Sequence, residues 1–446
     1  MIRKGWKSIS AVCLLRWGNR YWDETINKGN MSMNIKTGSN LAKVRKNNYA
    51  AILATIYQQG PITRNEIAKQ LDVTLPTVTT TIKQLLGEGI LKEVPIQEPG
   101  NALGRRAAAV DFEENAGYAA GIEWSPVGII ACITNLRGQM VAKRKKLMKR
   151  VAVPYIDMLY GTRQCLDELI QESGIDRGKI IGAGWATPGM VEPDEGVLVC
   201  SSMDGVVWHD EPVRKSLEVL LELPVCIENH VRVRAIGQDM FERRKRPEVY
   251  LYYFAQMGIS CCVMSEGEPF GKGKAGTGDI GHTVMDIDGP LCICGRQGCL
   301  QAFIGETALV NAARDLLRQG RADTLRQLCS NPGAPEVMEL AMAIDCGDDD
   351  LKEIVFPAIR YMGISIGNIV NLLNSQLVVI DCALLNSQVL KRYLDEIIYE
   401  SNIFKAELEL KTEYLNANRY TGAQGACALA IREFLIGRNV VEMDGK

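Results

Sequence analysis

Four potential metal ligands gather within a short run near the middle of this chain of 446 residues. His282 is followed by Cys292, Cys294 and Cys299, with glycines between the last two cysteines. One imidazole and three thiolates form the kind of closed, tetrahedral ligand set that holds a structural zinc ion. Glycine spacers permit the tight backbone turns that bring three sulfur atoms around one ion. The sequence therefore predicts a structural Zn²⁺ site made by these four residues.

Two alternatives to zinc follow from cysteine chemistry. A disulfide between Cys292 and Cys294 would be strained and disfavoured in a reducing cytoplasm, and a set of buried free thiols is also conceivable. The chain has only three histidines, so one at this position favours zinc. No convincing secretion signal and no apolar run of ~20 residues is present, so we expect a cytoplasmic protein. Its other cysteines then include small buried side chains at Cys132, Cys165, Cys226, Cys261, Cys262 and Cys427.

A helix-turn-helix is predicted in the first quarter of the chain. Thr63 and Glu66 form a capping box for one short helix, because each side chain can bond the other residue's backbone. After a tight turn at Asp72, Pro76 stands at an early, tolerated position of the next helix, which ends near Gly87. Two short helices joined by so brief a turn are typical of a DNA-binding motif.

The second helix of this motif carries hydroxyls, an amide and a cation on its outward face. Such groups suit contacts with phosphates and base edges in the major groove. A solvated, threonine-rich face is the alternative, but threonine is a mediocre helix former, so its abundance here favours recognition. We expect DNA contacts from Thr74, Thr77, Thr79, Thr80 and Lys83.

A basic wing is predicted after the helices. Strand-like residues 92–96 and apolar residues 107–112 flank a loop in which Arg105 and Arg106 are placed to reach phosphate or the minor groove. The first 112 residues hold sixteen basic and eight acidic side chains; the whole chain has a net charge of −2, so residues 113–446 carry −10. A basic N-terminal part joined to an acidic remainder is typical of a chain with a nucleic-acid-binding module. A basic surface that has no partner would give the same distribution of charge.

These motifs resemble the ROK family (repressors, open reading frames, kinases). Residues 41–112 look like the winged helix of its repressor branch, and residues 281–300 are similar to the family signature in order and spacing. The resemblance implies an α/β, actin-like ATPase fold over residues 113–446, with two lobes, a cleft and a zinc motif at 282–299 that braces a sugar pocket. The sequence itself alternates helix-like stretches with strand-like runs at 119–123, 127–134, 180–185, 249–253 and 377–380. Residues 1–40 are expected to be disordered or to follow a mis-assigned start codon.

Kinase chemistry is expected to be lost. The resemblance implies a catalytic aspartate where this chain has His230. At the family's first phosphate turn this chain has Glu123, Trp124 and Pro126. The second phosphate turn, residues 255–260, keeps only one glycine. Asp381 and Cys382 replace the glycine pair that the family has beside the adenosine. Side chains and a proline obstruct the backbone amides that would hold phosphate. We therefore predict no catalytic residues.

The family's sugar-contacting segments are better kept. Matching positions are Gly189, Glu228, Asn229, Asp279 and His282. Asp279 replaces a glutamate of the family and Gln301 replaces another, which keeps hydrogen-bonding capacity but changes its geometry. We expect a sugar or sugar derivative to bind, without specifying which; the alternative is that these residues only support the fold around the zinc.

Together these inferences predict a repressor of carbohydrate-metabolism genes, such as those of xylose. It would bind a double-stranded DNA operator as a homodimer or tetramer, and a ligand closing the cleft would retune it through residues 112–120. The apolar segment 354–375 is expected to be a helix of the core or of a subunit interface. Two alternatives stay open: an active sugar kinase with a DNA-binding arm, and a regulator that meets a protein partner instead of a sugar.

Overall fold

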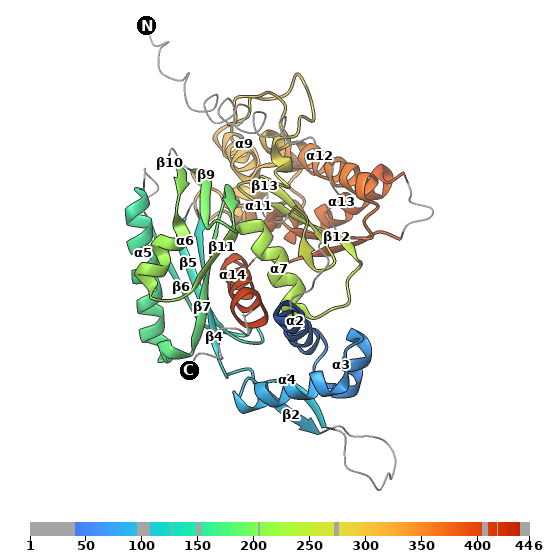
Figure 1. The fold of residues 1–446 in the computed structure, drawn as a ribbon. Coiled ribbons are helices and arrows are strands. Elements are labelled where there is room, and N and C mark those ends of the chain that lie inside the picture. The colour runs from blue at the N-terminus through green and yellow to red at the C-terminus, as the bar shows by residue number, and fades with distance from the viewer. Residues whose placement is uncertain are drawn as a thin grey trace, which may run out of the picture.

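The computed structural model describes residues 41–95, 108–125, 127–148, 153–203, 206–271, 276–403, 409–416 and 418–437 (Figure 1). The predicted extension of residues 1–40 and three residues singled out above, Arg105, Arg106 and Pro126, lie outside these ranges. Within the described part of the chain, no helix combines the length and the apolar character that crossing a membrane requires.

The front module packs three helices against a small antiparallel sheet of order β1-β3-β2. The Thr63 hydroxyl accepts from the Glu66 N–H at 3.2 Å while the Glu66 carboxylate accepts from the Thr63 N–H at 2.9 Å, so the predicted capping box is confirmed. Asp72 takes a φ of 51° at the turn, and the predicted helix-turn-helix is confirmed. The elements are α2 (Leu41–Gln59), β1 (Ile62–Thr63), α3 (Arg64–Leu71), α4 (Leu75–Gly87), β2 (Leu91–Pro95) and β3 (Ala108–Phe112).

The first lobe is built on a five-stranded sheet of order β11-β7-β4-β5-β6. Helices α5 and α6 pack on one face through Leu166 and Leu217, and α14 packs on the other (Figure 1). A smaller sheet of order β10-β9-β8 adjoins it. The elements are β4 (Tyr118–Ser125), β5 (Gly128–Asn135), β6 (Met140–Leu147), α5 (Tyr155–Ser173), η1 (Arg177–Lys179), β7 (Ile180–Thr187), β8 (Met190–Glu192), β9 (Val197–Met203), β10 (Val206–Glu211), α6 (Val213–Leu221), β11 (Val225–Asn229), α14 (Thr421–Ile431) and η4 (Arg432–Ile436).

The second lobe is built on a sheet of order β14-β13-β12-β15-β16 with a cluster of helices against it (Figure 1). The five predicted strand-like runs coincide with β4, β5, β7, β12 and β15, and the predicted helix at 354–375 belongs to α12. The elements are β12 (Val249–Ala255), β13 (Ile259–Ser265), β14 (Glu268–Pro269), η2 (Ile280–His282), α8 (Leu300–Ile304), α9 (Glu306–Arg318), α10 (Asp323–Leu328), α11 (Val337–Asp345), α12 (Asp349–Leu373), β15 (Leu377–Asp381), η3 (Ala383–Asn386), α13 (Gln388–Ser401) and β16 (Lys411–Tyr414).

Helix α7 (His230–Glu242) lies between the two lobes. It crosses α14 so closely that a side chain at Gly237 would meet Gly425 at 2.8 Å. On its other side, Val231 and Ala235 share a buried cluster with Tyr252 of the second sheet. The first residue of α7 therefore stands between the sheets, and the helix contacts both of them.

The predicted cysteine environments need one correction. Five of the six cysteines expected to be buried are so, but Cys226 is only partly buried. It lies on β11, the outermost strand of the first sheet, where no neighbouring strand covers one edge.

The front module is docked on the first lobe through a shared core and two arginines. Tyr57 and Phe112 belong to the same buried cluster as Cys427 of α14. Arg137 donates to the Tyr57 carbonyl at 2.7 Å and pairs with Asp111, and Arg243 at the end of α7 donates to the carbonyls of Gln58 and Gly60. These carbonyls lie at the C-terminal end of α2. The last carbonyls of a helix have no N–H donor within the helix, and positive charge is favourable there. Sequence reasoning placed the coupling in residues 112–120 and missed both arginines.

Replacing Arg137 by alanine should lower the free energy of unfolding by about 2–3 kcal/mol, because loss of this largely buried guanidinium removes the ion-pair partner of Asp111 and the donor to the Tyr57 carbonyl. Urea denaturation would measure the loss, and hydrogen exchange should accelerate at the end of α2. Arg244→Ala is the matched control, since Arg244 is largely exposed and pairs with Glu242 at the surface. Equal stability of the two variants would contradict the docking described here.

Candidate functional site

The outward face of α4 carries the residues expected to contact DNA. Thr74, Thr79, Thr80 and Lys83 are exposed, Thr77 is half-buried, and the opposite face buries Val78, Ile82 and Leu85. Thr74 is the N-cap of the helix, and its hydroxyl lies 2.9 Å from that of Thr77. Thr80 donates to the Pro76 carbonyl at 2.9 Å, so its oxygen lone pairs are left to accept. The face is therefore open to a ligand along its whole length.

The four predicted metal ligands converge. The ligand atoms of His282, Cys292, Cys294 and Cys299 all lie within 4.8 Å of one another. His282 ends η2, and Cys299 is the N-cap of α8. The Cys292 sulfur lies 3.5 Å from His282 Nδ1, and the sulfurs of Cys294 and Cys299 lie 3.6 Å apart.

The separations of 3.5 and 3.6 Å match the edges of one tetrahedral zinc site. Zinc–sulfur bonds of about 2.3 Å and zinc–nitrogen bonds of about 2.0–2.1 Å give tetrahedral edges of about 3.8 Å between two sulfurs and about 3.6 Å between sulfur and nitrogen. The turns require glycine as predicted: Gly295 and Gly298 have φ of 86° and 69°, and a side chain at Gly298 would overlap the Asp286 carbonyl. Burial raises the pKa of Cys294, but hydrogen bonds from the Arg296 amide and guanidinium outweigh this effect. The net pKa of Cys294 is therefore lowered, which favours the thiolate form.

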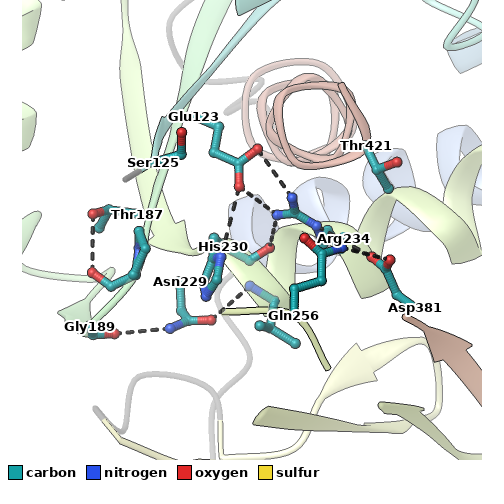
Figure 2. Close-up of polar contacts among 12 residues, drawn as sticks. Glu123, Ser125, Thr187, Gly189, Asn229, His230, Arg234, Gln256, Asp381 and Thr421 are labelled. Carbon is teal, nitrogen blue, oxygen red and sulfur yellow. Dashed lines mark hydrogen bonds and ion pairs between the residues drawn. The ribbon is translucent and has the colours of Figure 1, made fainter. Parts of the chain in front are cut away.

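Two of the predicted sugar-site residues contact each other directly. Asn229 ends β11, donates to the Gly189 carbonyl at 2.9 Å and caps α7 by accepting from the Val231 N–H at 2.8 Å (Figure 2). Gly189 has a φ of 105°, a conformation that other residues rarely adopt. The buried Glu228 accepts from the Asn229 N–H at 2.7 Å and lies 3.7 Å from Arg232. Burial raises the pKa of Glu228 despite this arginine.

The other sugar-site residues belong to the zinc loop. Asp279 is exposed and directly precedes η2, which ends at His282. A side chain at Gly281 would meet the Gln301 side chain at 3.0 Å and the Ile259 carbonyl at 2.6 Å, so this loop packs tightly on the β12–β13 hairpin. His282 thus belongs to the metal cluster and to the segment expected to contact sugar.

A buried ion pair that the sequence did not reveal lies where the first phosphate turn was expected. Arg234 on α7 donates to both carboxylate oxygens of Glu123, at 2.7 and 3.2 Å (Figure 2). His230 Nδ1 lies 3.8 Å from the same carboxylate. Burial raises the pKa of Glu123, but Arg234 outweighs it and lowers the net value. Burial, with Arg234, lowers the pKa of His230, although the Glu123 carboxylate raises it.

The expected adenosine side is occupied by a second polar cluster. Asp381 accepts from the Tyr252 hydroxyl at 2.9 Å and from the Gln256 amide at 3.1 Å, and its carboxylate lies 3.5 Å from Arg234 Nε (Figure 2). Glu306, at the start of α9, completes the acidic side of this cluster. Burial, with a contribution from Asp381, raises the pKa of Glu306 to about 7.

Replacing Glu306 by glutamine should change how stability depends on pH. A carboxyl whose pKa is raised on folding stabilises the protein below its unfolded pKa of 4.5, and that contribution is lost as pH rises to about 7. The difference in the free energy of unfolding between Glu306→Gln and the wild type should therefore be up to about 3 kcal/mol more favourable to the variant at pH 8 than at pH 4.5. Denaturation of both proteins at the two pH values measures this, and a difference independent of pH would contradict it.

Two family models match the chain, one on each module. The ROK family model matches residues 119–433, and the MarR family model matches residues 48–96. Among curated relatives, the xylose repressor of Caldicellulosiruptor bescii is 24% identical over 392 residues, covering 87% of this chain and 96% of the relative.

Solved structures agree with this fold. A ROK family transcriptional regulator, a homologue of the Escherichia coli MLC protein, superposes with a TM-score of 0.75 at 18% identity and covers 90% of this chain and 99% of that one. A ROK family glucokinase from Streptomyces griseus, solved with glucose and AMPPNP, gives a TM-score of 0.60 at 18% identity and covers 70% of this chain and 99% of that one. The transcriptional regulator thus covers a larger share of this chain than the kinase does.

Proposed function

Because this chain belongs to the ROK family, we propose that it is a DNA-binding transcriptional repressor of carbohydrate-metabolism genes whose kinase-like body receives a sugar signal. The observation that carries the proposal is the exposed face of α4, set on a helix-turn-helix that is packed onto that body. The xylose repressor to which the chain is similar matches both parts along nearly its whole length. We propose that Thr74, Thr77, Thr79, Thr80 and Lys83 contact the operator, with Arg105 and Arg106 on the wing.

The metal centre is proposed to hold one structural Zn²⁺. The donor set and the 3.5 and 3.6 Å separations support this assignment. Bound there, zinc would fix the loop from η2 to α8. Through His282 and the neighbouring Asp279, that loop would support one wall of the sugar pocket, with Gly189, Glu228 and Asn229 as the other proposed contacts.

The body is proposed to act as an effector domain without kinase activity. Arg234 and its two carboxylate partners fill the space between the segments expected to hold phosphate, and His230 faces Glu123 rather than standing free as a base. We expect no release of ADP above background with D-xylose or D-glucose, in the wild type or in His230→Asp, because restoring an aspartate does not remove Arg234. Sugar-dependent ADP release that His230→Asp enhances would contradict this and favour a kinase with a DNA-binding arm.

Selection from random duplex DNA tests the proposed function. The full-length protein should enrich a sequence with two half-sites, since helix-turn-helix repressors bind as symmetric dimers or tetramers with centres about 10 base pairs, or multiples of this, apart. A control selection with Thr79→Ala/Lys83→Ala should enrich nothing. Failure of the wild type to enrich any sequence would reject DNA recognition and leave the alternative of a regulator that acts through a protein partner.

A further inference from the structure

One buried guanidinium, that of Arg234, forms ion pairs with both lobes. Arg234 forms its bidentate pair with Glu123, which lies on β4 of the first sheet. Its Nε lies 3.5 Å from Asp381, the last residue of β15 in the second sheet. All three side chains are buried. Whichever sheet α7 follows when the lobes move, one of the two ion pairs must therefore cross between them.

The surroundings of Arg234 reinforce this link from both lobes. Its guanidinium stands over the ring of Phe254 on β12, with its central carbon 5.1 Å from the ring centroid, and the ring of His230 packs edge-on against the same phenylalanine at 5.1 Å. On the other side, a side chain at Gly422 of α14 would lie 2.2 Å from Glu123 Oε2 and 2.3 Å from Arg234 Nη1. The charged group is thus enclosed by elements of both lobes, and only glycine fits above it.

The two arms of the link are unequal. The arm to Glu123 consists of two hydrogen bonds in the geometry that a guanidinium favours with a carboxylate. The arm to Asp381 is a single ion pair, and Arg234 Nε has no hydrogen-bond partner among the described residues. Asp381 is instead held by Tyr252 and Gln256. The weaker arm is therefore the one that yields when the lobes separate.

We propose that Arg234 is an internal tie that sets the separation of the two lobes and positions His230 between their sheets. The tie includes His230 because Arg234 Nη1 also donates to the His230 carbonyl at 3.1 Å, and the His230 imidazole lies 3.8 Å from the same Glu123 carboxylate. A ligand that displaces His230 would act on the tie directly. The inference concerns only the two-lobed body and holds whether or not the chain binds DNA.

Hydrogen exchange of the full chain, measured without DNA or sugar, tests the tie. Asp381→Asn keeps the size of the side chain and an acceptor for Tyr252 but removes the charge that pairs with Arg234. We expect exchange to accelerate about tenfold in residues 377–385 and equally in residues 121–125 of the opposite lobe. Asp345→Asn is the matched control, because Asp345 accepts from Ser387 and nearby amides within the second lobe alone; it should leave residues 121–125 unchanged.

A second variant keeps the test decisive if the first folds poorly. Arg234→Lys retains the charge but cannot pair with both oxygens of Glu123 and reach Asp381 as well, so it should accelerate exchange in the same two segments. Acceleration confined to residues 377–385 in Asp381→Asn would show a merely local role and overturn the proposal. Unchanged exchange at residues 121–125 in both variants would overturn it as well.

Discussion

Replacing Cys294 by serine should abolish zinc binding at the proposed metal centre and unfold the loop from η2 to α8. The reason is that the four ligands converge in a loop that buries little apolar surface of its own: Ile287, Leu291 and Ile293 are exposed, and its regular backbone pairing consists of isolated β-bridges such as Val284–Cys299. Binding of a structural zinc ion contributes on the order of 10–16 kcal/mol in small zinc-folded peptides, so its loss leaves nothing comparable to order this segment. Elemental analysis should give one zinc per wild-type chain and none in Cys294→Ser.

The matched control is Cys346→Ser, because Cys346 is an exposed free thiol in the same lobe. It should keep its zinc and melt within about 2 °C of the wild type, whereas Cys294→Ser should melt several degrees lower. DNA binding should survive in Cys294→Ser, since α4 belongs to a different module. Full zinc content in Cys294→Ser, or no zinc in the wild type purified without chelators, would contradict the assignment.

The second large effect is expected on the outward face of α4. Replacing Thr79 and Lys83 together by alanine should weaken specific DNA binding by at least about 30-fold, because each base or phosphate contact contributes about 1–3 kcal/mol. Both side chains are exposed, so the fold and melting temperature should hold. Fluorescence anisotropy with the selected duplex measures the loss.

The control for this effect is Lys215→Ala, which removes an exposed lysine from α6 in the first lobe. It should bind the duplex as the wild type does. If Thr79→Ala/Lys83→Ala bound the duplex with wild-type affinity, the DNA-binding surface could not be the outward face of α4. A loss as large in Lys215→Ala would instead indicate attraction by overall charge rather than recognition by this helix.

Local chemistry explains what the sequence alone could predict. The capping box of Thr63 and Glu66, the turn at Asp72 and the convergence of the zinc ligands each depend on residues close together in the chain. Strand-like runs were recognisable because buried strands of these sheets are almost continuously apolar. The sugar-site residues and the DNA-contact residues remain predictions; apart from Arg105 and Arg106, which lie outside the described residues, they have defined places in the fold.

The contacts that link the parts could not be predicted in this way. Arg234 and Glu123 are 111 positions apart, and Arg243 lies 185 positions from Gln58. An arginine on a helix ordinarily indicates a solvated surface, and only the meeting of two lobes makes Arg234 a buried partner of two carboxylates. The one signal present in the sequence was the pair of carboxylates, Glu123 and Asp381, at positions where phosphate-binding turns were expected, because buried charges need a partner.

Titration of the selected operator with and without sugar tests the whole account most directly. The wild-type chain should bind the duplex at nanomolar concentrations, and one member of a panel that includes D-xylose should change that affinity at least about tenfold, as allosteric coupling typically does. Specific binding that no sugar in the panel alters would contradict the proposal that the kinase-like body carries a sugar signal to the winged helix.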